Sequence, residues 1–180
     1  MKKIILQACC APCACYPIKK LLNDNYLPVV FFYNPNIFPY KEYLIRKNEL
    51  ENYCTKLNID FFYDQYDIKK FYLETKGLEH EGEKGARCLV CFKLRLLKTA
   101  LYAKKNNISY FTSTLSVSPH KDYNQILTAG RYAQDQTGVE FVEYNFKKQD
   151  GFKISRSIAK ENNMYAQSYC GCLFSIRNRK

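Results

Sequence analysis

The chain has 180 residues, of which 47% are hydrophobic and 16% aromatic, and its 28 basic and 17 acidic residues give a formal net charge of +11. A chain of this length and apolar content buries a substantial core, which excludes an intrinsically disordered protein. The excess of basic residues favours a polyanionic partner, nucleic acid first, although a generally lysine-rich composition would give the same charge.

No apolar run is long enough to span a bilayer; the longest lies near residues 27–33. The first residues, MKKIIL, are similar to the start of a signal peptide, but Gln7 and the cysteines after it interrupt the apolar run. We therefore expect a cytoplasmic protein with no membrane partner. Nine cysteines in a reducing compartment favour metal binding or redox catalysis over a disulfide framework.

Short apolar runs alternate with amphipathic segments along the chain. The runs that predict strands are 3–8, 28–33, 59–63, 108–112 and 139–144. The segments that predict helices are 18–22, 41–57, 87–105, 124–136 and 154–162. The pattern is weaker over residues 64–85, and residues 80–85 are expected to form a loop or lid. This alternation predicts an α/β fold, a single domain over residues 1–180 with a mostly parallel sheet and helices on both faces. Ligands of such sheets bind at the carboxyl edge of the strands.

Six of the nine cysteines occur in three short motifs. Cys9 and Cys10 follow the first expected strand, Cys88 and Cys91 form a CxxC pair at a helix start, and a Cys-x-Cys pair stands at 170 and 172. No motif alone has enough thiols for a tetrahedral site, so a common site would be a product of folding. Four thiolates suit zinc and an iron–sulfur cluster equally. The sequence therefore predicts a metal–sulfur site at the carboxyl edge of the sheet.

Each cysteine motif has its own local chemistry. The helix start before Cys88 favours the thiolate form, and a turn at Pro12 is expected to bring Cys9 and Cys10 to one site. The pair at 170 and 172 could close a strained, catalytic disulfide, fill out the metal site or merely pack. Two further thiols, Cys13 and Cys15, are close enough in sequence to contribute, whereas Cys54 is expected in the core.

Other residues near the expected site edge are candidates for substrate binding. They comprise hydroxyl groups after the fourth strand, aromatic rings that stack on a base or pack in the core, and polar groups at loop starts: Tyr33, Asn34, Arg87, Thr112, Ser113, Thr114 and Tyr169. The basic stretches that could bind an RNA backbone are 93–105, 147–148, 153–160 and 177–180. The two histidines, His80 and His120, are expected at the surface.

Five blocks together resemble the QueH-type epoxyqueuosine reductase family: CCAPC, YNPNIFPYKEYLIRKNEL, RCLVCFKLRL, FTSTLSVSPHKD and YAQSYCGCLFS. They occur in this order over nearly the whole chain. The resemblance implies a cytoplasmic enzyme that removes the epoxide oxygen of epoxyqueuosine at the wobble position of tRNA, giving queuosine. It also implies a HUP-like, Rossmann-like fold, an iron–sulfur cluster without cobalamin, and an electron donor that the sequence does not identify.

The resemblance also assigns roles to the cysteines. Cys9, Cys10, Cys88 and Cys91 match the ligands of a [4Fe-4S] cluster, with Cys13 as a candidate further ligand. Cys170 and Cys172 match a pair that is either redox-active or holds an additional mononuclear iron, on a tail of residues 164–180 that folds back onto the site. A zinc-bearing RNA-binding module and a thiol-disulfide oxidoreductase remain as alternatives, but neither calls for the adjacent pair Cys9-Cys10.

Overall fold

The computed structural model of the chain describes residues 1–177. Within them, five parallel strands form one sheet in the order β3–β2–β1–β4–β5. The strands are β1 (Lys2–Gln7), β2 (Tyr26–Phe32), β3 (Phe61–Tyr63), β4 (Tyr110–Ser113) and β5 (Glu140–Phe141). In the centre of the sheet, Leu6 pairs with Val30 on one side and Thr112 on the other. The predicted parallel, Rossmann-like sheet is confirmed.

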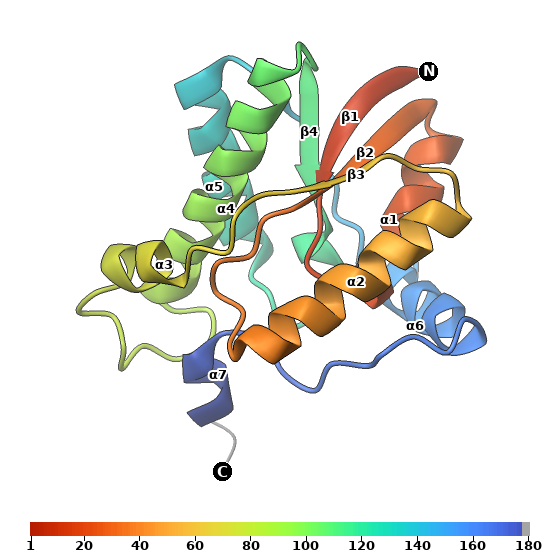
Figure 1. The fold of residues 1–180 in the computed structure, drawn as a ribbon. Helices are drawn as coiled ribbons and strands as arrows, with labels where there is room; N and C mark the ends of the chain where they lie inside the picture. The colour runs from red at the N-terminus through yellow and green to blue at the C-terminus, as the bar shows by residue number, and fades with distance from the viewer. Residues whose placement is uncertain (178–180) are drawn as a thin grey trace.

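Helices cover both faces of the sheet (Figure 1). One face carries α1 (Ala11–Asn23) and α2 (Tyr40–Lys56), and the other carries α4 (Ala86–Lys105) and α5 (Tyr123–Thr137). Successive residues of β1 point to opposite faces: Ile4 and Leu6 pack in the core on the first side, and Ile5 packs on the second. This double burial explains why β1 and β2 are continuous apolar runs.

The first helix differs from its prediction. It begins at Ala11 rather than at residue 18, and Pro12 lies in its first turn instead of forming a separate turn. Proline is tolerated there because the first backbone N–H groups of a helix have no intrahelical acceptor. Ala11, Ala14 and Ile18 then follow the three-to-four spacing of a buried face.

Three other segments also differ in extent or kind. The segment 64–79, where the sequence predicts no regular element, contains α3 (Ile68–Glu74), which begins where the Asp67 carboxylate accepts a hydrogen bond from Lys70 N at 3.0 Å. The strand expected at 139–144 is only the two residues of β5, since the Val142 carbonyl accepts the Thr112 hydroxyl at 2.8 Å. A short α7 (Leu173–Arg177) ends the described chain.

The remaining elements follow the predictions closely. The helix expected at 154–162 is α6 (Gly151–Glu161), and β4 runs into a single 3₁₀ turn over Thr114–Val117. Gly138 ends α5 in the left-handed conformation at φ 77° that the sequence predicts. No helix within residues 1–177 is both long and apolar enough to cross a membrane.

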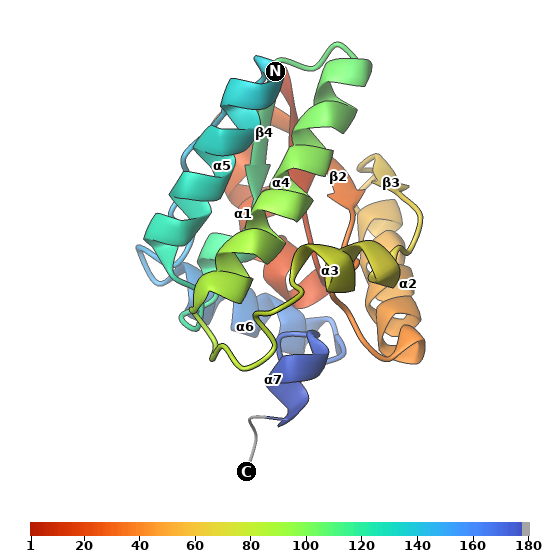
Figure 2. The same ribbon diagram turned by 90° about the vertical axis from the view of Figure 1, so that its left-hand side faces the viewer.

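The carboxyl edge of the sheet is covered by the end of the chain. In Figure 1 the strand arrows point toward the lower half of the view, where α6 and α7 lie, and Figure 2 shows both helices at the same end. Cys172 forms an antiparallel bridge with Ile37, and Phe38 N donates to Gly171 O at 2.8 Å. The Cys-Gly-Cys segment thus lies beside the loop that follows β2.

Candidate active site

The first group of thiols lies where β1 gives way to α1. Cys10 is the N-cap residue of α1 and Cys13 lies in its first turn, so the backbone has left the strand before the cysteines begin. The sulfur atoms of Cys9, Cys10 and Cys13 lie within 4.8 Å of one another, and those of Cys9 and Cys10 are 3.8 Å apart. Gln167 Nε2 donates to Cys10 Sγ at 2.8 Å. Three soft ligands at this spacing form a donor set for iron or zinc.

The pKa values of these thiols are shifted in different directions. Hydrogen bonds from Cys10 and Cys13 hold the pKa of Cys9 well below its ordinary value. Burial raises the pKa of Cys10 well above its ordinary value. The group therefore favours a single thiolate at Cys9, and a metal would have to displace the protons on its neighbours.

The second group of thiols lies between the start of α4 and the tail. Cys88, Cys91, Cys170 and Cys172 line one cavity of about 240 Å³. Burial raises the pKa of Cys91 to about 12, and it raises the pKa values of Cys88 and Cys172 as well. The expectation that the helix start lowers the pKa of the CxxC pair is wrong, because the desolvation of these thiols outweighs the helix dipole.

A second cavity joins the two thiol groups. It measures about 300 Å³ and is lined by Cys9 and Cys13 on one side and by Cys170 on another. Cys170, Glu83 and Tyr169 line both cavities. Cys170 therefore stands between the cysteines of α1 and those of α4.

Arg95 is a buried cation among the thiols of both groups. It is only 2% exposed, and its Nη2 lies 3.4 Å from Gln7 Oε1, which also accepts the Ser113 hydroxyl at 2.8 Å. Burial by itself lowers the pKa of Arg95, but Cys91 and Cys9 raise it overall. A permanent positive charge at this place offsets the negative charge of thiolate ligands.

Arg46 is the second buried cation and holds the tail. Its Nε donates to Glu42 Oε1 at 2.7 Å, and its two terminal nitrogens donate to the carbonyls of Cys170 and Tyr169, each at 3.1 Å. The Glu42 carboxylate also accepts the Tyr165 hydroxyl at 2.8 Å. These hydrogen bonds therefore join Arg46 to Glu42 in its own helix and to the backbone of the tail at Tyr169 and Cys170.

Lys121 is the third buried cation and contacts the tail thiol directly. Its Nζ lies 3.0 Å from Cys170 Sγ and 2.6 Å from Glu83 Oε1. Burial by itself lowers the pKa of Lys121, but Cys170 and Glu83 raise it overall. The ammonium group therefore keeps its proton in the wall of the larger cavity.

Four of the predicted substrate-binding residues support the site from behind. The Asn34 amide donates to Ala8 O at 2.9 Å and accepts from Gln7, while the Ser113 hydroxyl is bound to the same Gln7. Thr112 bonds the chain after β5, and the Tyr33 ring packs in the core beneath α4. None of these four side chains lines either cavity.

The other three predicted residues do line the cavities. Arg87 lies in the wall beside Cys88, where its guanidinium binds the backbone carbonyls of Leu78 and Glu79 at 3.0 and 3.1 Å. Thr114 faces the larger cavity, and Tyr169 is common to both. Arg87 also ties the 64–85 segment to the start of α4, so this segment is not a free lid.

Several site residues escaped the sequence analysis. Arg95 follows Cys88 and Cys91 at the spacing of one helical stripe, and Glu42 precedes Arg46 by four residues, so both arginines carry a local signal. Lys121 has no such signal, because it is brought to Cys170 only by folding.

Two cysteines lie outside both thiol groups. Cys54 is fully buried in the core between the sheet and α2, as predicted. Cys15 Sγ donates to Ala11 O at 3.0 Å within α1 and lies 3.5 Å from Met164 Sδ. Neither lines the cavities at the carboxyl edge.

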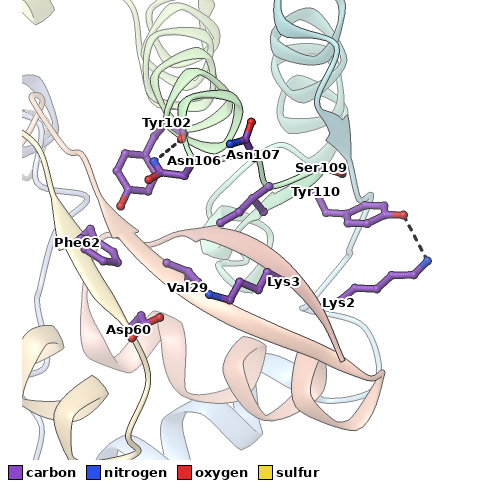
Figure 3. A pocket seen from close by; sticks show the side chains of 11 residues that line it. Lys2, Lys3, Val29, Asp60, Phe62, Tyr102, Asn106, Asn107, Ser109 and Tyr110 are labelled. Carbon is purple, nitrogen blue, oxygen red and sulfur yellow. Dashed lines mark hydrogen bonds between the residues drawn. The ribbon is translucent and has the colours of Figure 1, made fainter.

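A larger cavity of about 520 Å³ lies at the opposite, amino edge of the sheet (Figure 3). Its lining includes Lys2, Lys3, Phe62 and Tyr102 but no cysteine. Figure 3 shows Lys2 reaching toward the Tyr110 hydroxyl, at 3.3 Å, rather than into a ligand cradle. The chemistry of the thiols is therefore confined to the carboxyl edge.

Comparison with known proteins identifies the family. The profile of the family described as "Epoxyqueuosine reductase QueH" matches residues 4–178. This chain belongs to the epoxyqueuosine reductase QueH family. The relative in Acinetobacter baylyi is 41% identical over 98% of this chain and 81% of its own length. The relatives in Haemophilus influenzae, at 41% over 98% and 72%, and in Thermotoga maritima, at 32% over 100% and 93%, carry the same name.

The fold of this QueH family member also occurs in a solved structure. That structure is titled as a predicted subunit of a tRNA methyltransferase from Methanocaldococcus jannaschii, and it superposes with a TM-score of 0.60. It covers 89% of this chain and 75% of its own at 13% identity. The similarity supports the HUP-like architecture of the sheet and helices alone.

Arg95→Met should separate metal retention from folding. Replacing this guanidinium by an apolar side chain removes the cost of desolvating a charge but takes one donor from Gln7 Oε1, so the melting temperature of the metal-free protein should change little. Metal content after anaerobic purification should fall several-fold, because the thiolates lose a neighbouring cation. The control is Arg131→Met, which removes an exposed ion pair with Glu143 that is screened by solvent. Full metal retention by Arg95→Met would contradict the assigned role.

Gly171→Ala should loosen the tail without removing a thiol. Gly171 has φ +108°, and an added Cβ would lie 3.0 Å from Ile37 Cγ1. The strain should cost about 1–3 kcal/mol locally and speed hydrogen exchange of the Phe38 amide, which donates to Gly171 O. Gly82→Ala, where a Cβ meets nothing within 4 Å, is the control. Equal exchange at Phe38 in both variants would show that the tail is held elsewhere.

Proposed function

We propose that this chain reduces epoxyqueuosine in tRNA to queuosine, using a metal–sulfur centre and the thiols of the tail. The observation that carries the proposal is the meeting of two thiol groups at Cys170 in a chain that matches its enzyme family over nearly its full length. A net charge of +11 suits a tRNA substrate. Nine free cysteines suit the reducing cytoplasm.

The thiols present fit a metal–sulfur cofactor. They are soft donors, each is buried or half-buried, and the buried Arg46 and Arg95 lie beside them to offset thiolate charge. We assign Cys9, Cys10, Cys88 and Cys91 as ligands of a [4Fe-4S] cluster. Arg95 supports this assignment. Both Cys91 and Cys9 raise the pKa of its guanidinium, so thiols of both groups lie near the same cation. Cys13 is the competing ligand on geometry, since it already lies with Cys9 and Cys10.

The reaction consumes two electrons and two protons, releases the epoxide oxygen as water and leaves a carbon–carbon double bond. A [4Fe-4S] cluster, when bound, supplies single electrons from an external donor. The dithiol of Cys170 and Cys172 holds two electrons and two protons, which it releases on closing a disulfide.

The chain's own residues orient the reacting groups in this proposal. The Lys121 ammonium donates to Cys170 Sγ and holds the sulfur in position, while Glu83 holds the ammonium in place. Arg46 fixes the backbone at Cys170, so the sulfur keeps its place at the junction of the cavities. Tyr169, common to both cavities, is placed to contact the substrate base. In the alternative, Cys170 and Cys172 bind an additional mononuclear iron.

A zinc-bearing RNA-binding module is the second candidate. The 3.8 Å between the sulfurs of Cys9 and Cys10 is close to the separation of two thiolates on a tetrahedral zinc, about 3.8 Å for Zn–S bonds of about 2.3 Å. Such a module would hold one metal, contain no sulfide and turn over no substrate.

Cluster content distinguishes the two candidates. Protein purified without oxygen should contain about four iron and four acid-labile sulfide per chain and show an EPR signal after reduction. It should then convert epoxyqueuosine-containing tRNA to the queuosine form, as seen by mass spectrometry of the nucleosides. One zinc without sulfide would overturn the reductase proposal.

Ligand variants test the assignment of the cluster. Cys88→Ser and Cys91→Ser should lose most of the iron and sulfide, whereas Cys13→Ser should retain both. Cys54→Ser, in the core, is a control that changes stability without removing a proposed ligand. Loss of the cluster in Cys13→Ser with retention in Cys91→Ser would replace Cys91 by Cys13 in the ligand set.

Cys170→Ser tests the dithiol. The variant should keep its cluster but lose turnover, since a single thiol cannot release two electrons as a disulfide. Full turnover by this variant would remove the dithiol from the mechanism. Loss of iron beyond the cluster's share would favour the mononuclear site.

A further inference from the structure

One face of α6 lines the cavity of about 300 Å³ at the carboxyl edge of the sheet. Phe152 and Arg156 are one helical turn apart, and both line the cavity that Cys9, Cys13 and Cys170 also line. Phe152 is 41% exposed, although it is one of the larger apolar side chains of the molecule. An aromatic ring and a guanidinium therefore lie together where a substrate would enter.

Contacts with α1 and with the residues before α6 hold this helix in place. The Ser155 hydroxyl donates to Pro12 O at 2.9 Å, in the first turn of the helix that carries Cys13. At the start of α6, a Cβ added to Gly151 would lie only 1.8 Å from Phe146 O, so the backbones approach closely there. The exposed face of α6 thus keeps a constant distance from the thiols of α1.

The exposed face of α6 carries unpaired positive charge. Within residues 1–177, neither Arg156 nor Lys153 has a hydrogen-bond acceptor or carboxylate partner in the protein. The segment 147–161 has five basic and two acidic side chains. This charge is available to an anion from outside the chain.

The interior of the cavity also lacks partners for two polar atoms. Thr114 Oγ1 and Gln167 Oε1 are buried, and within the described part of the chain neither has a hydrogen-bond partner. Thr114 is only 1% exposed, and both residues line the cavity. Unsatisfied buried polar atoms are costly, and a polar group that enters the cavity would satisfy these two.

We propose that Phe152 and Arg156 form a binding ledge for single-stranded RNA. Phe152 stacks on the base next to the one that enters the cavity, Arg156 binds the phosphate between them, and Thr114 and Gln167 meet polar edges of the entering base. The proposal rests on the proposed function, since it takes tRNA as the substrate, and it names the contact that the reductase uses to hold the loop.

The chemistry of the ledge fits an RNA loop rather than a duplex. Bases in a loop splay out and stack on aromatic or guanidinium planes, whereas paired bases hide their faces in the helix. A cavity of about 300 Å³ is at the lower end of the range for ligand pockets, about 300–1,000 Å³, and suits one base. The unpaired cations outside the cavity then meet the backbone on either side.

Two single variants and two matched controls test the ledge. Phe152→Ala is matched by Leu73→Ala, another exposed apolar residue, and Arg156→Ala by Lys56→Ala, an exposed cation in the last turn of α2. Binding of a synthetic anticodon stem-loop RNA to the anaerobically purified protein is measured by fluorescence anisotropy at several salt concentrations.

The two variants should weaken binding in different ways. Phe152→Ala should lose roughly five- to hundredfold in affinity with an unchanged salt dependence, because stacking is not an ionic contact. Arg156→Ala should lower the slope of log affinity against log salt by about 0.7–1, the share of one phosphate contact. The two controls should bind as the unchanged protein does.

Affinities and salt slopes of both variants equal to those of their controls would overturn the ledge. A second RNA is a hairpin whose loop is replaced by a short non-nucleotide linker. If the two variants lost as much affinity for this hairpin as for the intact stem-loop, the ledge would also be overturned. Because binding is measured without turnover, a protein that binds through the ledge but does not reduce tRNA would sustain this inference and refute the reductase activity.

Discussion

The buried guanidinium of Arg46 connects the Cys-Gly-Cys segment to the rest of the fold. It donates to the carboxylate of Glu42 and to the carbonyls of Tyr169 and Cys170, so one side chain satisfies groups from two segments more than a hundred residues apart. Arginine suits this role because its planar fork donates in several directions at once and never loses its charge. The bridge at Ile37 and the contact of Lys121 with Cys170 Sγ hold the same segment from other sides.

Buried positive charge also counteracts the effect of burial on the thiols. The site cysteines are buried or half-buried, and burial raises the pKa values of Cys10, Cys88, Cys91 and Cys172. A site built of thiols alone would resist becoming thiolate. Four buried cations, one on α2, two on α4 and one after β4, place positive charge beside these thiols. The site therefore combines soft ligands with a local excess of positive charge, which suits both an anionic metal–sulfur centre and a polyanionic substrate.

The residues that support the thiols and the residues that line the cavity beside them come from different parts of the fold. The ends of β1 and β4 carry polar side chains such as Gln7 and Ser113 that bond to one another behind the thiols, where they fix the loops rather than meet a ligand. Access is provided by segments from later in the chain, since α6 and the tail supply the cavity's rim. This arrangement follows from the parallel sheet, in which every strand delivers its following loop to the same edge.

Local patterns in the sequence determined the strands, the main helices and the three cysteine motifs. A buried parallel strand, a three-to-four apolar spacing and a glycine at a helix end each depend on a few neighbouring residues, so they can be read without the fold. Tertiary structure decided which thiols meet: it placed Cys13 with Cys9 and Cys10, and Cys170 between both groups. It also brought Lys121 to Cys170 and left Asn34 behind the site. These outcomes depend on burial and on hydrogen bonds between distant segments, which no local pattern records.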